Sequence, residues 1–286
     1  MTEKSQAGSR KPEARGGGRE FVLHAEGVSF AYGKQRVVDG VSLKLAAGEV
    51  LAIVGPNGCG KSTLLKLLCG QLQPQAGAVR VGDEGGAMAG MTPAAIARQI
   101  ALVPQSSAVG FDYSVRQIVL MARWPAHARS GGGGVALTLG FETAADQRIA
   151  DRAMWAMDVH YLADRPITEL SGGERQRVIV ARALAQETPA ILLDEPATAL
   201  DLWHQLELFD HLQRLARAER KAILMVTHDL NHALAYADRV VVMDAGRIVA
   251  EGPPCLVLTP ATLEPVYRVA VQTGSATVLT FKKRAV

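Results

Sequence analysis

Apolar runs separated by turn residues fill the first hundred positions of the chain and predict a β-rich beginning. The runs start at Phe21, and Gly, Asp and Lys bound them. The segment EVLAIVG, residues 49–55, leads directly into a glycine-rich stretch. In STLLKLLCG, residues 62–70, the leucines then follow with helical spacing up to Gly70. The pattern predicts a strand, a glycine loop and a helix, in that order.

The later apolar runs predict an α/β domain with a helical insert. Further short strands are expected around Val81, Val103, Leu193, Met225 and Val242. Between residue 106 and about residue 188 the strand signal gives way to amphipathic helical patterns. After residue 252 the pattern predicts a short helix and one last strand.

Length and composition are those of a globular chain with one large domain or a domain with a subdomain. The 286 residues are 48% apolar, which suffices for a sizeable core. Residues 1–20 are rich in Gly, Ser and charge, so we predict that they are disordered. We assign residues 21–260 to the main domain, with a helical subdomain at about 106–188, and residues 261–286 to an extension packed on it.

The charge balance and the cysteines exclude several classes of function. The net charge is +3, but residues 1–20 hold five Lys or Arg against three Asp or Glu, which leaves +1 for the rest. This balance argues against a nucleic-acid partner. The three cysteines are odd in number and lack metal-ligand spacing, so neither a disulfide framework nor a zinc site is expected. The sequence has neither the apolar core of a signal peptide nor a window long enough to span a bilayer. If the protein works at a membrane, we therefore expect it to act from the cytoplasmic side.

The stretch GPNGCGKST, residues 55–63, fits the pattern G-x-x-x-x-G-K-[ST]. Glycines let successive backbone N–H groups converge, and the following helix adds partial positive charge, so the loop suits nucleotide phosphates. Lys61 would reach the β- and γ-phosphates, and Ser62 would ligate Mg²⁺. The alternative, a glycine-rich turn with an exposed lysine, is disfavoured because the loop lies between a predicted strand and a predicted helix.

A second motif, AILLDEP, ends a predicted buried strand in Asp194 and Glu195. Carboxylates there can hold Mg²⁺ through water and polarise an attacking water molecule. Alone, such acids could simply solubilise a strand end. Beside the glycine loop, they indicate hydrolysis of a nucleotide.

The segment LSGGERQRV, residues 170–178, completes a set of motifs with the glycine loop, LVPQ, LLDEP, TALD and VTHD. In this order and spacing, residues 21–260 resemble the nucleotide-binding subunit of ATP-binding cassette (ABC) transporters. The resemblance implies an α/β P-loop NTPase core with an antiparallel β subdomain and an inserted α-helical subdomain. It also implies ATP and Mg²⁺ as cofactors.

The resemblance implies roles for individual residues. Glu195 would be the catalytic base, while Gln105 would couple the metal and water to the helical insert and His228 would contact the γ-phosphate. Ser62, Gln105 and Asp194 would ligate Mg²⁺. Tyr32 would stack on the adenine, with an ordinary core aromatic as the alternative. The nucleotide-binding set is Tyr32, Gly55, Pro56, Asn57, Gly58, Cys59, Gly60, Lys61, Ser62, Thr63, Ser171, Gly172, Gly173, Glu174 and Asp201.

The segment from Ser171 to Glu174 stands where a helix is predicted to begin, and it offers a second set of backbone donors for phosphate. The resemblance implies that this set completes the site of the opposite subunit, so that two chains enclose two ATP molecules. Asp201 would then lie at the dimer seam.

Two positions depart from the family pattern. Cys59 stands where a small residue such as Ser or Ala is usual, and Ala197 replaces a common Thr. A thiol near Lys61 and a helix N-terminus is expected to have a lowered pKa and to be accessible without nucleotide, so that alkylation would inhibit and ATP would protect. An inert filler of space is the alternative.

Three further segments are similar to importers of ferric siderophores, haem and cobalamin: residues 112–125, 200–209 and 228–254. This resemblance implies a homodimer, a separate membrane permease and, indirectly, a periplasmic or surface binding protein, with the chain peripheral at the cytoplasmic face of the plasma membrane. The insert at residues 113–124 would receive the permease, although its apolar residues could equally be core.

Other functions remain to be weighed against import of a chelate. A zinc or manganese importer would share every ATPase residue. A non-transport ABC ATPase acting on DNA or ribosomes would need coiled coils, a tandem domain or a basic face, and a P-loop kinase or GTPase would not require LSGGE. The sequence does not identify the cargo.

Overall fold

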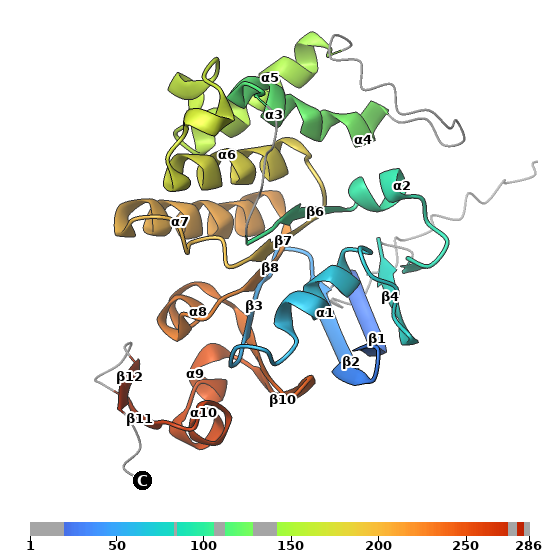
Figure 1. Ribbon diagram of the computed structural model, residues 1–286, viewed down its shortest axis with the longest axis vertical. Helices are drawn as coiled ribbons and strands as arrows, with labels where there is room; N and C mark the ends of the chain where they lie inside the picture. Colours follow the sequence, from blue (N-terminus) through green and yellow to red (C-terminus); the bar gives the residue numbers. More distant parts are fainter. Residues whose placement is uncertain (1–19, 83–84, 106–111, 128–141, 274–278, 283–286) are drawn as a thin grey trace, which may run out of the picture.

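The computed structural model describes residues 20–82, 85–105, 112–127, 142–273 and 279–282 (Figure 1). Disorder was predicted for residues 1–20: residues 1–19 lie outside this description, whereas Glu20 is described and its carbonyl oxygen accepts from Ala47 N at 2.8 Å. Among the described residues, no helix combines the length and hydropathy that a bilayer-spanning segment needs.

A six-stranded sheet with the order β10-β9-β3-β8-β7-β6 forms the centre of the molecule. The four pairs among β9, β3, β8, β7 and β6 are parallel, while β10 joins β9 in an antiparallel hairpin. Strands β3, β7 and β8 are buried along their whole length, as expected for parallel strands covered on both faces. The strands are β3 (Val50–Val54), β6 (Ile100–Val103), β7 (Ala190–Asp194), β8 (Ala222–Val226), β9 (Arg239–Asp244) and β10 (Arg247–Gly252).

An antiparallel sheet with the order β2-β1-β4-β5 packs beside the central sheet. Its strands are β1 (Phe21–Tyr32), β2 (Gln35–Ala46), β4 (Ala76–Val81) and β5 (Gly86–Ala87). Helix α1 (Lys61–Leu68) buries four leucines in one core cluster with residues of both sheets. The predicted order of strand, glycine loop and helix is therefore present as β3, residues 55–60 and α1 (Figure 1).

The described part of region 106–188 is helical, and in Figure 1 most of it forms the top of the molecule, away from β1 and β2. Buried Val115, Ile118 and Val119 belong to the core, whereas Trp124 is 43% exposed. The helices described between residues 93 and 185 are α2 (Pro93–Ala97), α3 (Val115–Leu120), η1 (Met121–Arg123), α4 (Trp124–His127), α5 (Ala144–Ala156), η2 (His160–Leu162), η3 (Ile167–Glu169) and α6 (Gly172–Ala185).

The rest of the chain completes the cover of the central sheet. Helix α7 (Leu202–Glu219) connects β7 to β8, and α8 (Leu230–Tyr236) connects β8 to β9. After β10 the chain forms α9 (Pro254–Val257), α10 (Pro260–Tyr267) and a hairpin of β11 (Ala270–Thr273) and β12 (Leu279–Lys282). The sequence predicted one short helix and one strand after residue 252, whereas the structure has two helices, α9 and α10, and two strands. The additional helix and strand β11 were not predicted, because these segments are too short for a clear periodicity.

Candidate active site

Four parallel strands bring the predicted catalytic and metal-binding residues to one edge of the central sheet. The glycine loop follows β3, Gln105 follows β6, Asp194 ends β7, and His228 follows β8. Ligands of open α/β sheets bind outside the carboxyl ends of the strands. A cavity of about 610 Å³ lies there, lined by Val37, Asn57, Gly58, Gly60, Lys61, Ser62, Thr63, Gln105, Glu195 and His228.

The backbone of the loop has a shape that only glycine permits at two positions. Gly60 has a φ of 105°, and a Cβ there would lie 2.3 Å from the carbonyl oxygen of Val37. A Cβ on Gly55 would lie 2.2 Å from the carbonyl oxygen of Met243. Gly60 is also the N-cap of α1 and offers no side-chain cap, so the first-turn N–H groups are left for a ligand.

The ammonium group of Lys61 lies against the backbone of the glycine loop. The side chain is buried, and Nζ donates to the carbonyl oxygens of Gly55 at 2.8 Å and Pro56 at 2.9 Å. An ammonium group has three donors, and the third meets Cys59 Sγ at 3.9 Å, a long and weak contact that an anionic oxygen can replace. The loop thus presents a fixed positive charge next to the helix N-terminus.

The carboxylate of Glu195 is the point where three other side chains meet. Its Oε2 accepts from Gln105 Nε2 at 2.9 Å, lies 3.3 Å from His228 Nδ1, and accepts from Thr198 Oγ1 at 3.3 Å. Gln105, Glu195 and His228 were predicted, and the structure brings them together. Thr198 was missed, although its hydroxyl three residues after Glu195, beside Ala197, could have suggested it.

The backbone of Glu195 adopts a conformation that is rare for a residue with a side chain. Its φ is 48°, in the left-handed region, which costs of the order of 1–2 kcal/mol. The N–H of Glu195 donates to the carbonyl oxygen of Val226 at 2.9 Å, so the end of β8 holds the residue in place. Strain of this kind is typical of functional sites.

Asp194 is the residue best suited to a metal ion. It is 9% exposed, and its Oδ1 is buried with no hydrogen-bond partner among the described residues. Burial, with Glu195 next to it, raises the pKa of its carboxyl group, although the Ser62 hydroxyl donates to it. An unpaired carboxylate oxygen beside a hydroxyl fits Mg²⁺, which prefers oxygen ligands.

The rest of a metal shell would come from outside the chain. In the described part of the sequence, no group of three or more His, Cys, Asp or Glu side chains is placed to hold a metal ion. Mg²⁺ commonly binds through one or two carboxylates, waters and substrate phosphates. The donors Ser62, Asp194 and Gln105 match that mode.

Tyr32 lies outside the set of residues that line the cavity. It is 50% exposed, and its ring meets that of Phe30 edge-on with 4.9 Å between centroids. This exposure excludes the alternative of a core aromatic. Tyr32 pairs with Gln35 at the end of the β1–β2 hairpin, two residues before Val37, which does line the cavity. Val37 was not predicted, because no motif marks it.

The segment Ser171–Glu174 also lies outside the cavity of its own chain. Ser171 is exposed and caps α6, since its Oγ accepts from Glu174 N at 3.3 Å and donates to Glu174 Oε2 at 2.7 Å. The hydrogen bond from the Ser171 hydroxyl, and a second one from Ser171 N to Glu174 Oε2 at 2.8 Å, lower the pKa of Glu174. Asp201 is likewise exposed, and it caps α7 through His204.

The expectation for Cys59 is wrong. The residue is only 4% exposed, and burial raises the pKa of its thiol despite the nearby Lys61. A Cβ on Gly55 would lie 2.9 Å from Cys59 Sγ, so the sulfur fills the space inside the loop. The structure favours the alternative, an inert filler.

Comparisons with known proteins agree with this geometry. The family model described as "ABC transporter" matches residues 38–198. The cobalamin import ATP-binding protein BtuD of Halobacterium salinarum is 42% identical over 90% of this chain, which spans 62% of that relative's length. The hemin import ATP-binding protein HmuV of Rhodococcus jostii is 43% identical over 86% of this chain and 80% of its own. The iron(3+)-hydroxamate import ATP-binding protein FhuC of Bacillus subtilis is 37% identical over 86% and 88%.

Solved structures show the same fold. A chain of a structure described as a metal-chelate type ABC transporter in an inward-facing conformation is 30% identical over 92% of this chain and 98% of its own, with a TM-score of 0.75. The ADP conformation of MJ1267, an ATP-binding cassette of an ABC transporter, is 27% identical over 87% and 98%, with a TM-score of 0.73. The predicted fold class is thereby confirmed, and the chain belongs to the ABC transporter family.

Proposed function

We propose that this chain is the ATP-hydrolysing subunit of an ABC importer. The observation that carries the proposal is the carboxylate of Glu195, held by Gln105 and His228 at the mouth of the cavity that the glycine loop forms. Hydrolysis of a nucleoside triphosphate requires a site that binds the phosphates and a group that orients the attacking water. The glycine loop and the carboxylate match these two requirements.

In this proposal the loop binds the triphosphate. Backbone N–H groups of the loop and of the first turn of α1 donate to phosphate oxygens, and Lys61 turns the ammonium proton that faces Cys59 Sγ at 3.9 Å toward a phosphate oxygen. Ser62 and Asp194 would hold Mg²⁺, with Gln105 as a third donor. The metal, when bound, would neutralise charge on the phosphates.

Glu195 then accepts a proton from water at the γ-phosphate. His228 and Gln105 already contact the same carboxylate oxygen, so both can orient the water and hold the carboxylate. The strained backbone of Glu195 fixes the direction of the side chain. The groups for attack are thus present within one chain.

The donors of Ser171–Gly173 point to a second copy of the chain. They are partly or fully exposed and absent from the cavity of their own chain, although their backbone N–H groups suit phosphate. We propose that each copy completes the site of the other, with Asp201 at the seam. Binding of ATP closes the pair and hydrolysis releases it, so that the nucleotide drives a change of population between two states.

The proposed cargo is an iron chelate, haem or cobalamin. The names of the relatives support this class, as do the three sequence segments that resemble such importers. The chain would act through a separate membrane permease at the cytoplasmic face, with a binding protein that delivers the cargo. Mg²⁺, the permease, the binding protein and this location belong to the proposal.

Glu195→Gln tests the proposed hydrolysis. The variant should bind ATP, form a dimer and lose turnover by about a hundredfold or more, because an amide cannot accept the proton. ATP turnover, nucleotide affinity and sedimentation with ATP and Mg²⁺ measure the three outcomes. As a control, Glu219→Gln makes the same chemical change at an exposed end of α7 and should leave turnover unchanged. Near wild-type turnover in Glu195→Gln would remove the assignment of the base.

Uptake measurements test the cargo. A deletion strain should lose uptake of a labelled ferric chelate, haem or corrinoid, and the wild-type gene should restore it while Glu195→Gln should not. Loss of zinc or manganese uptake in place of these would assign the chain to a different importer.

A further inference from the structure

The turn between β9 and β10 lies against the outside of the glycine loop. Arg247 pairs with Asp244, and the two residues between them, Ala245 and Gly246, have φ values of 45° and 81°, as in a tight type I′ hairpin turn. The N–H of Gly246 donates to the carbonyl oxygen of Cys59 at 3.0 Å. The turn therefore supports a residue in the middle of the loop.

Strand β2 supports the same turn from its other side. The carbonyl oxygen of Gly246 accepts from the N–H of Asp39 at 2.9 Å. The carbonyl oxygen of Val37 comes so close that a Cβ on Gly60 or on Gly246 would meet it at 2.3 or 2.7 Å. Because Val37 also lines the cavity, β2, the turn and the loop form one packed unit around the proposed phosphate site.

The carboxylate of Asp39 links β2 to the turn and β10 through ion pairs on the surface of this unit. These pairs, of Asp39 with Arg247 and Arg36, are called the fastener below. Its Oδ2 accepts from Arg247 Nε at 2.8 Å and Nη2 at 2.5 Å, and its Oδ1 accepts from Arg36 Nη1 at 2.8 Å. The hydrogen bond from Arg247 and then that from Arg36 lower the pKa of Asp39, so the carboxylate is ionised at neutral pH. Both oxygens are occupied by guanidinium donors.

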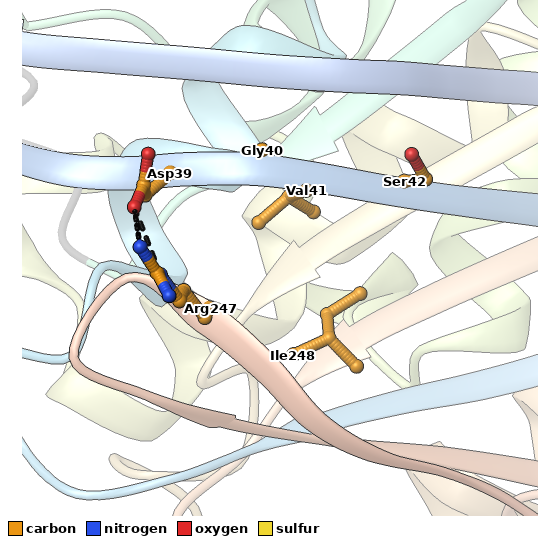
Figure 2. A pocket seen from close by; sticks show the side chains of 6 residues that line it. All are labelled: Asp39, Gly40, Val41, Ser42, Arg247 and Ile248. Atoms are coloured by element: carbon orange, nitrogen blue, oxygen red, sulfur yellow. Dashed lines mark hydrogen bonds and ion pairs between the residues drawn. The ribbon is translucent and has the colours of Figure 1, made fainter.

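Beyond this point β2 and β10 separate. Figure 2 shows the Asp39–Arg247 pair at one end of a crevice of about 380 Å³, with Val41 and Ile248 facing one another across it. Within the described residues, every hydrogen bond between β2 and either β10 or the turn before it uses Asp39. Asp39 thus makes the hydrogen bonds that tie the turn and β10 to β2, one through its backbone N–H and two through its carboxylate.

We propose that Asp39, fastened by Arg247 and Arg36, is a positioning residue for the phosphate loop. It holds Gly246 against Cys59 and Val37 against Gly60, and so keeps the loop in the shape that binds nucleotide. The inference rests on the proposed function, since it deepens the account of the ATP site. Both arginine side chains are about two-thirds exposed, so a modest effect is expected, as for other ion pairs in water.

Nucleotide kinetics test this role. Asp39→Asn and Arg247→Ala should each raise the KM for ATP by roughly three- to tenfold and leave kcat within about twofold, because the catalytic groups stay in place. The double variant should be no worse than either single one, since both changes break the same pair. A KM equal to that of wild type, or additive losses, would overturn the proposal.

Glu26→Gln is a matched control. Glu26 is another exposed carboxylate of the same antiparallel sheet, away from the loop, with Arg80 Nε at 3.5 Å and His24 Nδ1 at 3.2 Å. This variant should leave the KM unchanged. An equal rise of the KM in Glu26→Gln would show that loss of any surface pair in the sheet has this effect, and the specific role of Asp39 would fail.

The labelling rate of Cys59 reports on the loop without any activity. Cys59 is buried beneath the Gly246 contact, so breaking the fastener should speed its alkylation by roughly threefold or more, while Glu26→Gln should not. Peptide mass spectrometry separates Cys59 from Cys69 and the exposed Cys255. An unchanged rate in Asp39→Asn would contradict the inference. If the wild-type protein bound no nucleotide, the proposed function would fail. The labelling rates would still show whether Asp39 holds the glycine loop in shape.

Discussion

Two helices of this chain begin in glycine-containing segments that are expected to meet phosphate, yet the two N-termini differ. Helix α1 begins after Gly60, which has no side chain to cap it, and Lys61 is buried in its first turn. Helix α6 begins after Ser171, whose hydroxyl and backbone are both bonded to Glu174. The first terminus is open inside a cavity, and the second is capped and exposed.

The difference shows that the two termini are prepared for different partners. The donors of α1 are fixed within one chain, and only a ligand can satisfy them once water is excluded. Those of α6 are stabilised by a capping box, so that this segment is stable in a single chain. In the proposed dimer, Ser171 would exchange Glu174 for the phosphate of the partner's nucleotide.

The largest expected effect is a loss of nucleotide affinity when a methyl group is added at the N-terminus of α1. The same addition at the N-terminus of α6 serves as the comparison. Gly60→Ala places a Cβ 2.3 Å from the carbonyl of Val37 at a φ of 105°, so the loop must move, and nucleotide affinity should fall by about a hundredfold or more. Gly172→Ala meets nothing within 4 Å in its own chain and should leave the affinity of a single chain for nucleotide unchanged. Titration with a fluorescent ATP analogue measures both.

Thermal unfolding of both variants serves as the control for this comparison. It separates loss of binding from loss of fold. A Gly60→Ala protein that is folded and binds nucleotide within threefold of wild type would show that the shape of the loop does not decide binding.

A smaller effect is expected from the cap of α6. In the Glu195→Gln background, Ser171→Ala should weaken the ATP-dependent dimer by about tenfold or more, as one hydrogen bond to a charged group is lost, while the affinity of a single chain for ATP stays the same. The lost cap should also lower the Tm by about 2 °C. Sedimentation and calorimetry measure the two changes.

Ser114→Ala offers a matched control for that change. Ser114 caps α3 with the same kind of box, through Gln117. This variant should lower the Tm similarly but leave the dimer intact. If both variants weakened the dimer equally, the effect would be one of stability, and Ser171 would have no special part in closure.

The sequence predicted the parts of the site that local pattern determines. The strand before Gly55, the helix after Gly60 and the acids that end β7 could be identified because turn chemistry and periodicity act over a few residues. Parallel strands then brought Gln105, Glu195 and His228 to one edge of the sheet. Their common contact at one oxygen follows from that topology.

The sequence could not predict features that depend on packing between distant segments. Val37 lines the cavity only because β2 crosses beside α1, and Asp39 meets Arg247 across more than two hundred positions of the chain. For Cys59, local pattern led to the wrong expectation. A helix N-terminus and a lysine lower the pKa of a thiol, but in the folded loop burial outweighs both.

A further expected effect concerns stability alone, and it has opposite signs at the two termini. Asp194, near α1, has a raised pKa and an unpaired buried oxygen, whereas hydrogen bonds from Ser171 lower the pKa of Glu174 in α6. Without nucleotide or metal, Asp194→Asn should raise the Tm at pH 7 by roughly 2–6 °C, because the amide carries no charge and so removes the cost of burying a carboxylate beside Glu195, which is about 1–3 kcal/mol. Glu174→Gln should lower the Tm.

The dependence of the Tm on pH tests whether the ionised carboxyl groups cause both changes in Tm. The destabilisation by Asp194 is absent below its unfolded pKa of 3.8 and grows as pH rises toward its higher folded value, so the gain in Asp194→Asn should shrink toward pH 4. The contribution of Glu174 is present above its unfolded pKa of 4.5 and disappears as pH falls through its lower folded value. Calorimetry from about pH 3 to pH 7 measures both trends. A Tm that fell in Asp194→Asn at pH 7 would show that the carboxylate is already satisfied without a metal ion, and α1 would then differ less from α6 than the geometry indicates.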